Sequence, residues 1–490
     1  MASSAKLIHV PLSPLDHIPP QNYVKIGLYL PLRPSVRAED AFHNLQDGLH
    51  RSFMQIPWLG GKVYWQHQDA PGWRPSQLEI RYNPISPDSP RPYQLKLHVL
   101  DASYEDLQDR GFPTDEFSDE DLLWAPFFAD INAGAEVFVA QANFMEDGCL
   151  LTMSTCHPSA DGTAMITILK LWAQHCRRLQ GETDDEPLFD ITPESSDRNI
   201  LDRLWKQEQS SHSTEEMDPA AWHMVGLDHP NDAKSISTSS PPPPVPSPET
   251  PSRVMRSAVF YIPAERFTAL RAQCTKDNGG ASDLSSNDIV TALIWRSLMT
   301  ARQAARSSED ITSTLAELEM TVDGRPDFSH FLPETYLGNV VLINRPTLPL
   351  EKLIDPSTPL GTVAQTIRDT ARVIHHENMM DAYSLLRGVS DFSERKLRFT
   401  TVEGSSMLIT SLLAFPIEEI CFGDQFFGRG GRPEAFRPLM SSFNHLFRIS
   451  FILPRARNGG VEFVVSLFDE EMGALEGNEE FSEYAVLLSD

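Results

Sequence analysis

A run of serine and proline at 235–253, SISTSSPPPPVPSPETPSR, divides this chain into two halves and limits how it can fold. A segment of this composition cannot bury enough apolar surface to become ordered, so it connects domains instead of entering a core. The chain has 490 residues, of which 41% are hydrophobic, and it is too long for one ordinary core. The sequence therefore predicts an N-terminal domain over 1–200, a Pro/Ser-rich linker over 201–254 and a C-terminal domain over 255–490.

Both halves alternate between segments with strand patterns and segments with helix patterns. In the first half, two strand-like runs at 137–144 and 149–155 flank a short turn. We expect a hairpin there, with Gly148 supplying the permissive backbone, and a helix after Gly162. Strands and helices alternate again in the second half. This pattern predicts the α/β class with mixed sheets.

Charge and composition narrow the class of function. The chain has 41 Lys and Arg against 68 Asp and Glu, a formal net charge of −27, which repels nucleic acid and acidic membranes. No run of about 18 apolar residues is present, and the N-terminus lacks the apolar core of a secretion signal, so we expect a cytoplasmic protein that does not cross a membrane. The five cysteines show no Cys-x-x-Cys spacing, which predicts neither a disulfide framework nor a metal site.

The pattern His-x-x-x-Asp-Gly occurs twice, starting at His43 and at His157. The first copy falls within 41–54, where apolar residues recur at helical spacing. His43 and Asp47 share a helix face, which His50 continues, while the apolar stripe lies on another face. We interpret the first copy as solvated surface without a chemical role.

The second copy has a different setting, because His157 stands where the predicted strand at 149–155 ends. The ends of strands are where α/β proteins place reactive groups. A histidine there can act as a general base near neutral pH. Asp161 either faces the site or ties down the turn by pairing with an arginine, and Gly162 permits close backbone approach. From these residues alone, a structural histidine in a strand-to-helix turn remains an equal alternative.

Several motifs in a fixed order resemble the BAHD acyltransferase family, especially its fungal branch of trichothecene 3-O-acetyltransferases. Besides HPSADG at 157–162, they are LSPLD (12–16), SYEDLQDRGFP (103–113), AQANF (140–144), VDGRPDF with YLGN (322–339) and GRPEAFRP (431–438). The likeness covers nearly the whole chain. The ordered combination is specific, although no single segment is.

The resemblance implies two chloramphenicol-acetyltransferase-like domains with a channel at their interface and His157 at its middle. It implies an enzyme that moves an acyl group, expected to be acetyl, from a coenzyme A thioester to a hydroxyl or amine of a small secondary metabolite, with His157 as general base. Asp161 is expected to pair with Arg325 and, with Gly162, to hold the turn. Acyl-CoA is then a cosubstrate, no cofactor or metal is tightly bound, and we expect a monomer.

The chain departs from the family's C-terminal motif, Asp-Phe-Gly-x-Gly. Cys421 stands where the family has Asp, and Leu412 stands where it has Trp. Either Asp424 supplies the missing carboxylate or the ion pair of the family is absent. The resemblance leaves Thr410 and Ser411 as candidates to contact the oxyanion or the acceptor. The candidates for coenzyme A binding in this loop are Gly423, Asp424, Arg429 and Arg432. Further basic candidates for its phosphates are Arg302, Lys396 and Arg437.

Two other interpretations remain open. Condensation-like domains, which act on carrier-bound acyl groups, share the His-x-x-x-Asp-Gly turn, but they usually carry a second histidine just before it, where this chain has Cys156. The second interpretation is a non-catalytic α/β scaffold that kept the motif. A serine hydrolase is disfavoured because the sequence contains no Gly-x-Ser-x-Gly elbow.

Overall fold

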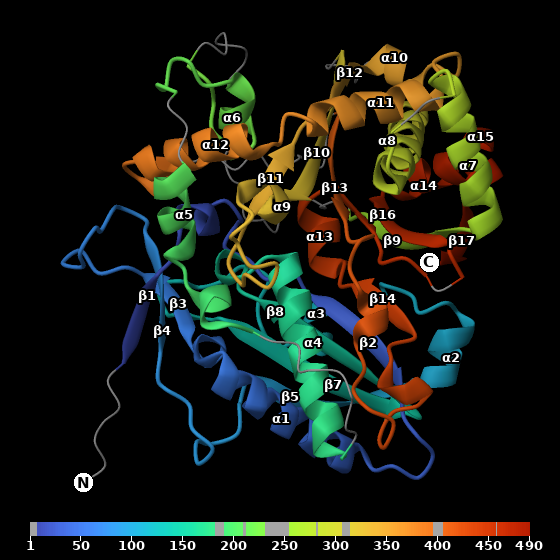
Figure 1. Cartoon of the computed structure of the whole chain (residues 1–490). Coiled ribbons are helices and arrows are strands. Elements are labelled where there is room, and N and C mark those ends of the chain that lie inside the picture. Colours follow the sequence, from blue (N-terminus) through green and yellow to red (C-terminus); the bar gives the residue numbers. More distant parts are fainter. Residues whose placement is uncertain are drawn as a thin grey trace, which may run out of the picture.

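The structure is a computed structural model of the chain (Figure 1). It describes residues 7–181, 191–208, 212–230, 254–280, 283–305, 314–394, 405–456 and 458–490. The Pro/Ser-rich stretch at 235–253 lies outside the described residues, so its role as a linker stays a prediction. The described residues form three sheets with helices packed against them, and two of the sheets are mixed. The predicted α/β class with mixed sheets is therefore confirmed.

A five-stranded mixed sheet forms the centre of the first half, in the order β14-β2-β8-β7-β5. Its strands are β2 (Ile26–Pro31), β5 (Leu95–Ser103), β7 (Phe138–Glu146), β8 (Gly148–Thr155) and β14 (Ala435–Pro438). Helices α1 (Ala38–Gln55) and α4 (Gly162–Leu179) lie side by side across one face of this sheet, in blue and teal in the lower part of Figure 1. The indole of Trp172 on α4 donates to the backbone carbonyl of Leu45 on α1 at 2.8 Å, which fixes the two helices against each other.

The hairpin predicted around Gly148 is present, but its glycine has a different role. β7 and β8 pair antiparallel, with Met145 opposite Gly148. Asp147, and not Gly148, has the left-handed backbone conformation, with a φ of 57°. A Cβ at Gly148 would lie 1.9 Å from Cδ2 of Tyr104. The expectation of a permissive backbone at this position is therefore wrong, and glycine is needed because an aromatic ring packs directly against it.

A small antiparallel sheet, in the order β1-β4-β3-β6, lies at the edge of the first half (Figure 1). Its strands are β1 (Ile8–Pro11), β3 (Lys62–Trp65), β4 (Leu78–Tyr82) and β6 (Ala135–Glu136). The 3₁₀ turn Pro57–Gly60 connects the end of α1 to β3 and buries Trp58 in the core of this half. The short helices of the first half are α2 (Tyr104–Asp109) and α3 (Asp119–Leu122).

An eight-stranded mixed sheet forms the second half, in the order β11-β10-β13-β15-β16-β9-β17, with β12 paired to β10. Its strands are β9 (Arg256–Ile262), β10 (Leu315–Asp323), β11 (Val341–Asn344), β12 (Thr347–Pro349), β13 (Ser406–Ser411), β15 (Ile449–Ile452), β16 (Val461–Leu467) and β17 (Val486–Ser489). Its helices are α7 (Ala264–Asp277), α8 (Ser286–Ala305), α9 (Arg325–Phe328), α10 (Leu350–Ile354), α11 (Leu360–Ala371), α12 (His376–Gly388), α13 (Ser441–Leu446), α14 (Asp469–Glu476) and α15 (Glu479–Tyr484). None of the helices in the described ranges, α8 included, is long and apolar enough to cross a membrane.

The two sheets do not divide cleanly at the predicted linker. β14 pairs antiparallel with β2, with Phe436 opposite Leu28, so a strand from the second half completes the sheet of the first. Phe422, Phe427 and Phe443 also lie in the core of the first half. The domain boundary predicted from the sequence therefore does not separate the two cores, because residues from the second half pack into the core of the first.

Two helices, α5 (Ile200–Glu208) and α6 (Pro219–His223), overlap the segment 201–254 that was predicted as a linker. Leu201 and Ala221 are fully buried in a hydrophobic cluster that includes residues of α12. The indole of Trp205 donates to the hydroxyl of Ser384 on α12 at 2.7 Å. The described residues at the start of the predicted linker are therefore folded against the second half. Their composition had instead predicted a segment that does not enter a core.

Gly148→Ala is expected to destabilise the fold, because the added methyl group would overlap the ring of Tyr104. Overpacking of a buried site costs about 1–3 kcal/mol. Gly473→Ala is the matched control, since no atom lies within 4 Å of its Cβ position on helix α14 and alanine is favoured in a helix by about 0.5–1 kcal/mol. Urea unfolding of the two variants should shift in opposite directions. An unchanged midpoint for Gly148→Ala would contradict the role of the ring.

Candidate active site

Strand β8 delivers His157 to the start of a 3₁₀ turn, His157–Ser159, that leads into helix α4. Asp161 caps this helix, because its carboxylate accepts from the N–H of Ala164 at 2.9 Å. The N–H of His157 donates to the carbonyl of Asn22 at 2.9 Å. The strand, the cap and this bond together fix the backbone that carries the imidazole.

The imidazole of His157 is half-buried. Its Nδ1 is buried and has no hydrogen-bond partner among the described residues. Burial lowers the pKa of His157 below its ordinary value of about 6.5, while its own backbone and the charge of Asp161 act more weakly in the opposite direction. The ring is therefore neutral at pH 7, the state in which a histidine can accept a proton.

A buried ion pair joins the His157 turn to the second half of the chain. Nη2 of Arg325 lies 2.9 Å from Oδ1 of Asp161, and both side chains are buried. The guanidinium also pairs with Asp323 at 2.8 Å and donates to the carbonyl of Gly338 at 2.7 Å. The other carboxylate oxygen of Asp161 accepts from the N–H of Val340 at 2.9 Å. Asp161 is thus fully engaged in holding the turn, and the structure brings it together with Arg325.

A second buried ion pair, between Arg198 and Asp16, also supports the His157 turn. Nη1 of Arg198 lies 3.1 Å from Oδ1 of Asp16, and Nη2 of Arg198 donates to the carbonyl of Ser159 at 2.6 Å. The side-chain amide of Asn339 donates to Asp16 at 3.0 Å and to the carbonyl of His157 at 3.1 Å. The backbone of the turn is therefore held by hydrogen bonds at both of its ends.

Sequence reasoning missed this second pair. The motifs LSPLD and YLGN contain Asp16 and Asn339, but neither residue was given a partner. Arg198 lies in a segment with no motif of its own. Only its burial, at 4% exposure, distinguishes it from an ordinary surface arginine, and burial cannot be read from one sequence.

The first copy of the motif lies on α1, mostly on its outer side. His43 is exposed, and Asp47 pairs with Arg91 at 2.8 Å on the surface, as expected for a copy without a chemical role. His50 differs, since it is only 2% exposed and its ring nitrogens have no partner in the described part of the chain. The expectation that His50 continues a solvated face is wrong, because residues 48–50 are all buried where α1 is covered towards its C-terminal end.

The segment after β13 packs against the start of α4. A Cβ at Gly162 would lie 2.9 Å from Cζ of Phe415, so Gly162 leaves room for this ring. Thr410 and Ser411, the last residues of β13, are half-buried. Leu412, at the position of the family's tryptophan, is buried. The two hydroxyl candidates therefore lie a few residues from a segment that touches the helix following the His157 turn.

The loop after Cys421 closes on itself and is anchored to the end of α4. The thiol of Cys421 donates to the carbonyl of Gly430, so a neutral hydrogen bond stands where the family has a carboxylate. Gln180 accepts from the N–H of Gln425 at 3.0 Å. Gly423 has a φ of 90°, and a Cβ there would lie 2.4 Å from the side chain of Gln180. Gly423 thus shapes the loop through its own backbone.

Asp424 does not occupy the position of the missing carboxylate. Its side chain is exposed and pairs with Arg33 at 3.1 Å, on the surface of the first half. Cys421 itself is buried. The two residues therefore lie in different environments although they are close in sequence.

The basic candidates of this loop lie on its surface. Arg429 pairs with Glu434 at 2.8 Å, and Nε of Arg432 donates to the carbonyl of Glu418 at 3.2 Å. Of the further basic candidates, Arg302 and Arg437 are buried, and Lys396 lies outside the described residues. A buried arginine bonded to the protein cannot reach a phosphate in solvent, so the expectation for Arg302 and Arg437 is wrong.

The described ranges contain no group of three or more His, Cys, Asp and Glu side chains that could hold a metal ion. The five cysteines are free and buried. Burial raises the pKa of Cys176 and Cys274, the latter to about 12, so neither thiol is ionised at neutral pH.

Comparison with known proteins agrees with this geometry. The Transferase family matches residues 126–482, and the trichothecene 3-O-acetyltransferase-like N-terminal domain matches residues 22–176. Eremophilane O-acetyltransferase ORF8 of Penicillium roqueforti is 24% identical over 98% of this chain and 98% of its own length. The isocyanide synthase-NRPS hybrid crmA of Aspergillus fumigatus is 30% identical over 97% of this chain, which spans only 31% of that relative's length. TRI101 of F. sporotrichioides, solved with coenzyme A and T-2, has a TM-score of 0.74 at 21% identity, over 98% of this chain and 100% of that one.

Two α/β domains with mixed sheets, joined through a buried ion pair at a His-x-x-x-Asp-Gly turn, define a fold shared with TRI101. The Transferase match covers well over half of the sequence, and this chain belongs to that family, the BAHD acyltransferases. The resemblance drawn from the sequence motifs is confirmed, and so is the two-domain fold that it implied. The chain is an acyltransferase.

Asp161→Asn is expected to destabilise the protein by about 3 kcal/mol, because it removes one carboxylate from the buried guanidinium of Arg325. Asp47→Asn removes the matching carboxylate of the exposed copy and should change the free energy of unfolding by less than about 0.5 kcal/mol. Urea unfolding measures both variants. Equal losses in the two would show that the buried pair does not hold the turn to the second half.

Proposed function

We propose that this acyltransferase moves an acyl group, expected to be acetyl, from coenzyme A to a hydroxyl or amine of a small secondary metabolite, with His157 as the general base. The likeness to an eremophilane O-acetyltransferase and to TRI101 with bound coenzyme A supports the donor and the class of acceptor. The observation that carries the proposal is the neutral, half-buried imidazole at the end of β8, on a turn held by both halves of the chain.

His157 supplies the proton transfer that the reaction needs. The neutral imidazole takes the proton of the acceptor hydroxyl as its oxygen attacks the thioester carbonyl, and a tetrahedral oxyanion forms. The hydroxyl of Thr410 or Ser411, or a backbone N–H, donates to this oxyanion, a contribution of about 3–4 kcal/mol for each donor. The carbon–sulfur bond then breaks, and the imidazolium returns the proton to the departing thiolate. These reaction steps need no acyl-enzyme intermediate.

Asp161, Gly162 and Arg325 position the base and do not share the proton. Both oxygens of Asp161 accept hydrogen bonds from Arg325 and from backbone N–H groups, which leaves neither for an acceptor molecule. Gly162 admits Phe415 and so brings the end of β13 towards the turn. Substitutions at these positions are expected to act through the geometry of His157.

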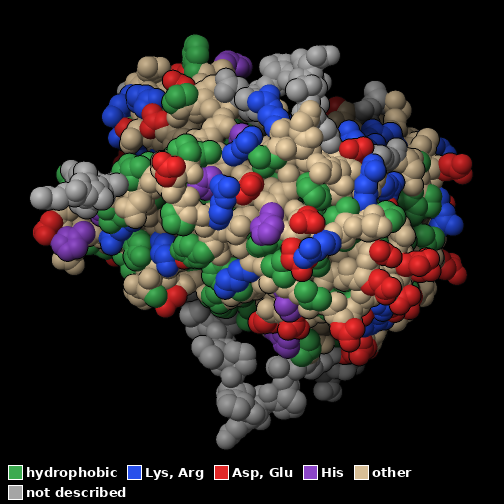
Figure 2. Space-filling model, turned by 90° about the horizontal axis from the view of Figure 1, so that it is seen from below, with side chains coloured by type: hydrophobic (Ala, Val, Ile, Leu, Met, Phe, Trp, Pro, Cys, Tyr) green, Lys and Arg blue, Asp and Glu red, His purple; other side chains and the backbone are tan. Residues whose placement is uncertain are grey.

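Coenzyme A is polyanionic, whereas this chain has a formal net charge of −27. Figure 2 shows acidic side chains crowded on one side of the face seen from below. The phosphates must therefore meet local positive charge. We favour Arg432, which hydrogen-bonds to a neutral carbonyl, over Arg429, whose charge is compensated by Glu434. Gly423 and Asp424 contribute by shaping the loop that carries both arginines.

A second candidate function is acyl transfer from or to a carrier protein. The relative that is 30% identical to this chain is an NRPS hybrid, and condensation-like domains, which act on carrier-bound acyl groups, share the His-x-x-x-Asp-Gly turn. A carrier thioester presents the same carbonyl as coenzyme A, so the role of His157 would be unchanged.

His157→Ala is expected to lower the rate of thiol release by a factor of about 10²–10⁴, the contribution of a general base. The assay supplies acetyl-CoA and an eremophilane alcohol and measures free thiol. His43→Ala, in the exposed copy of the motif, is the matched control and should leave the rate unchanged. Circular dichroism checks that both variants are folded. Turnover of His157→Ala near that of the wild type would rule the role out.

The same assay separates the candidate functions when acetyl-CoA is compared with an acetylated phosphopantetheinyl carrier protein as donor. Release from acetyl-CoA supports the proposed function, and release from the carrier alone supports the second candidate. Release from neither donor, with any acceptor, would contradict both candidate functions.

The pH dependence of kcat/KM is expected to have its acid limb below pH 6.5. Burial lowers the pKa of His157, so the imidazole stays neutral to a lower pH than an exposed histidine with a pKa of about 6.5. As pH falls through the lowered pKa, the ring becomes protonated and can no longer accept a proton, and the rate is lost. A pH–rate profile measures this limb, and a limb above pH 6.5 would contradict the environment described for His157.

A further inference from the structure

The backbone of His157 is held from both halves of the chain. Its N–H donates to the carbonyl of Asn22, in the first half, at 2.9 Å. Its carbonyl accepts from the side-chain amide of Asn339, in the second half, at 3.1 Å. The same amide nitrogen also donates to the carbonyl of Pro158 at 3.1 Å. Asn339 is thus a residue of the second half that bonds directly to the residue proposed as the base.

The surroundings of the Asn339 side chain determine which way its amide points. Besides the two carbonyls of the turn, Oδ1 of Asp16 lies 3.0 Å from Nδ2 of Asn339. The amide oxygen of Asn339, by contrast, is buried and has no partner in the described part of the chain. In the reversed orientation this oxygen would face a carboxylate and two carbonyls, and none of these can donate. Position 339 therefore requires an NH₂ group, which donates two hydrogens.

The backbone around Asn339 fixes the position of this amide. The N–H of Asn339 donates to Oδ1 of Asp16 at 2.8 Å, and the next N–H, of Val340, donates to Oδ2 of Asp161 at 2.9 Å. Asn339 is 0% exposed, so its side chain cannot contact a bound acceptor. Any influence of Asn339 on the reaction must therefore pass through the turn that carries His157.

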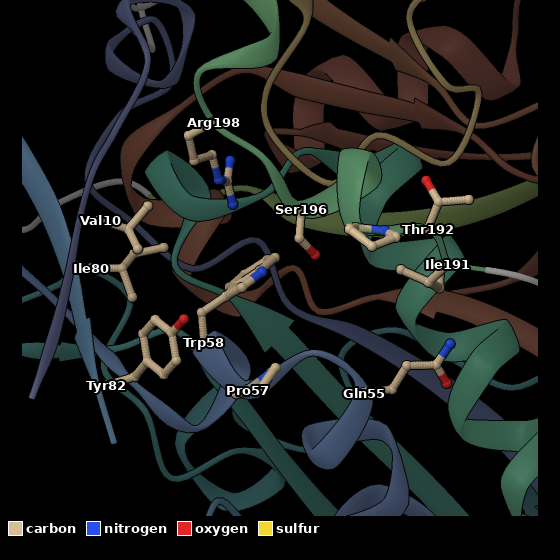
Figure 3. Close-up of a pocket in the computed structure, with 11 residues that line it drawn as sticks. Val10, Gln55, Pro57, Trp58, Ile80, Tyr82, Ile191, Thr192, Ser196 and Arg198 are labelled. Carbon is tan, nitrogen blue, oxygen red and sulfur yellow. The ribbon is translucent and has the colours of Figure 1, made fainter. Parts of the chain in front are cut away.

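The charges packed around the turn are paired with each other. Asp161 pairs with Arg325 at 2.9 Å, and Asp16 pairs with Arg198 at 3.1 Å. Figure 3 shows Arg198 near the indole of Trp58, and its guanidinium carbon lies 4.8 Å from the centre of that ring. Each charge is thus compensated by its partner. The side chain that donates to the carbonyl of His157 is the neutral amide of Asn339.

The carbonyl that Asn339 holds also acts on the imidazole. The backbone of His157 raises the pKa of its own ring, against the larger effect of burial, because a carbonyl oxygen close to a ring N–H favours the protonated form. A hydrogen bond from Asn339 engages the same oxygen and makes it a weaker acceptor for the ring. Asn339 therefore helps to keep the imidazole in the neutral state that accepts a proton.

We propose that Asn339 is a positioning residue for His157: its amide holds the carbonyl of the base and so fixes how the imidazole is presented to the acceptor. The proposal rests on the proposed role of His157 as general base. It adds a contact by which the second half of the chain acts on the base itself, separate from the ion pair at Asp161.

A titration of His157 tests the contact without any turnover. Histidines are labelled with carbon-13 at Cε1, and the His157 resonance is assigned by its absence from His157→Gln. Asn339→Leu removes the NH₂ group but keeps the branched shape, so the ring stays buried. The pKa of His157 is expected to rise by about 0.5–1 in this variant, because its carbonyl becomes free to stabilise the imidazolium. An unchanged or lowered pKa would overturn the proposal.

Asn143→Ala is the matched control for this titration. Asn143 is also 0% exposed, and its amide donates to the carbonyls of Leu122 and Leu150 at 3.0 Å, at the end of the β7–β8 hairpin away from His157. This variant should lose stability and leave the pKa of His157 unchanged. A rise equal to that in Asn339→Leu would show a general effect of destabilisation and would overturn the proposal. If circular dichroism shows Asn339→Leu to be unfolded, Asn339→Ala takes its place.

The kinetics provide a second measurement. In Asn339→Leu, kcat is expected to fall by a factor of about 10–100, the effect of a base displaced from its reactive orientation. KM for acetyl-CoA should stay within about twofold, because the buried side chain does not contact the substrates. A raised KM with kcat unchanged would overturn the positioning role.

The two measurements separate the failure of this inference from that of the proposed function. A wild-type protein that releases no thiol contradicts the proposed function. A His157 resonance that titrates alike in Asn339→Leu and in an active wild type contradicts the positioning role alone.

Discussion

The ion pair between Asp161 and Arg325 is the constraint on which the site depends. Burying two charges costs desolvation energy, and the pair is tolerated only when the remaining hydrogen-bonding capacity of both groups is used. Here the carboxylate also accepts from the N–H groups of Ala164 and Val340, and the guanidinium also donates to the carbonyl of Gly338. Because these atoms come from both halves of the chain, the backbone around His157 reaches its geometry only when the halves are packed together.

Local sequence patterns predicted the parts of the site that follow one another along the chain. The hairpin, the turn and helix α4 lie within 138–179, and the spacing of apolar residues indicates each of them. The pairing of Asp161 with Arg325 needed the family resemblance, because no spacing relates two residues that are far apart in sequence. The same resemblance located the departure at Cys421, although only the structure shows its thiol bonded to Gly430.

Burial and long-range pairing could not be predicted. Asp16 and Arg198 are charged, so composition places them on the surface, yet packing makes them a buried pair beneath the turn. Helices α5 and α6 fall in a stretch whose charge and prolines suggest a linker, yet their apolar sides find partners on α12. Gly148 appears in the sequence as a turn residue, and the ring of Tyr104 that requires it lies on a different element. In each case the deciding neighbour is distant in sequence.

The pairing of β14 with β2 also affects how the chain is made. Ile26 emerges from the ribosome long before its partner Pro438 does. During that interval the apolar strand β2 has an open edge of N–H and C=O groups, the kind of edge on which unfinished chains associate with one another. Cells that make this protein in quantity would therefore depend on chaperones that shield the nascent sheet until its last strand is released.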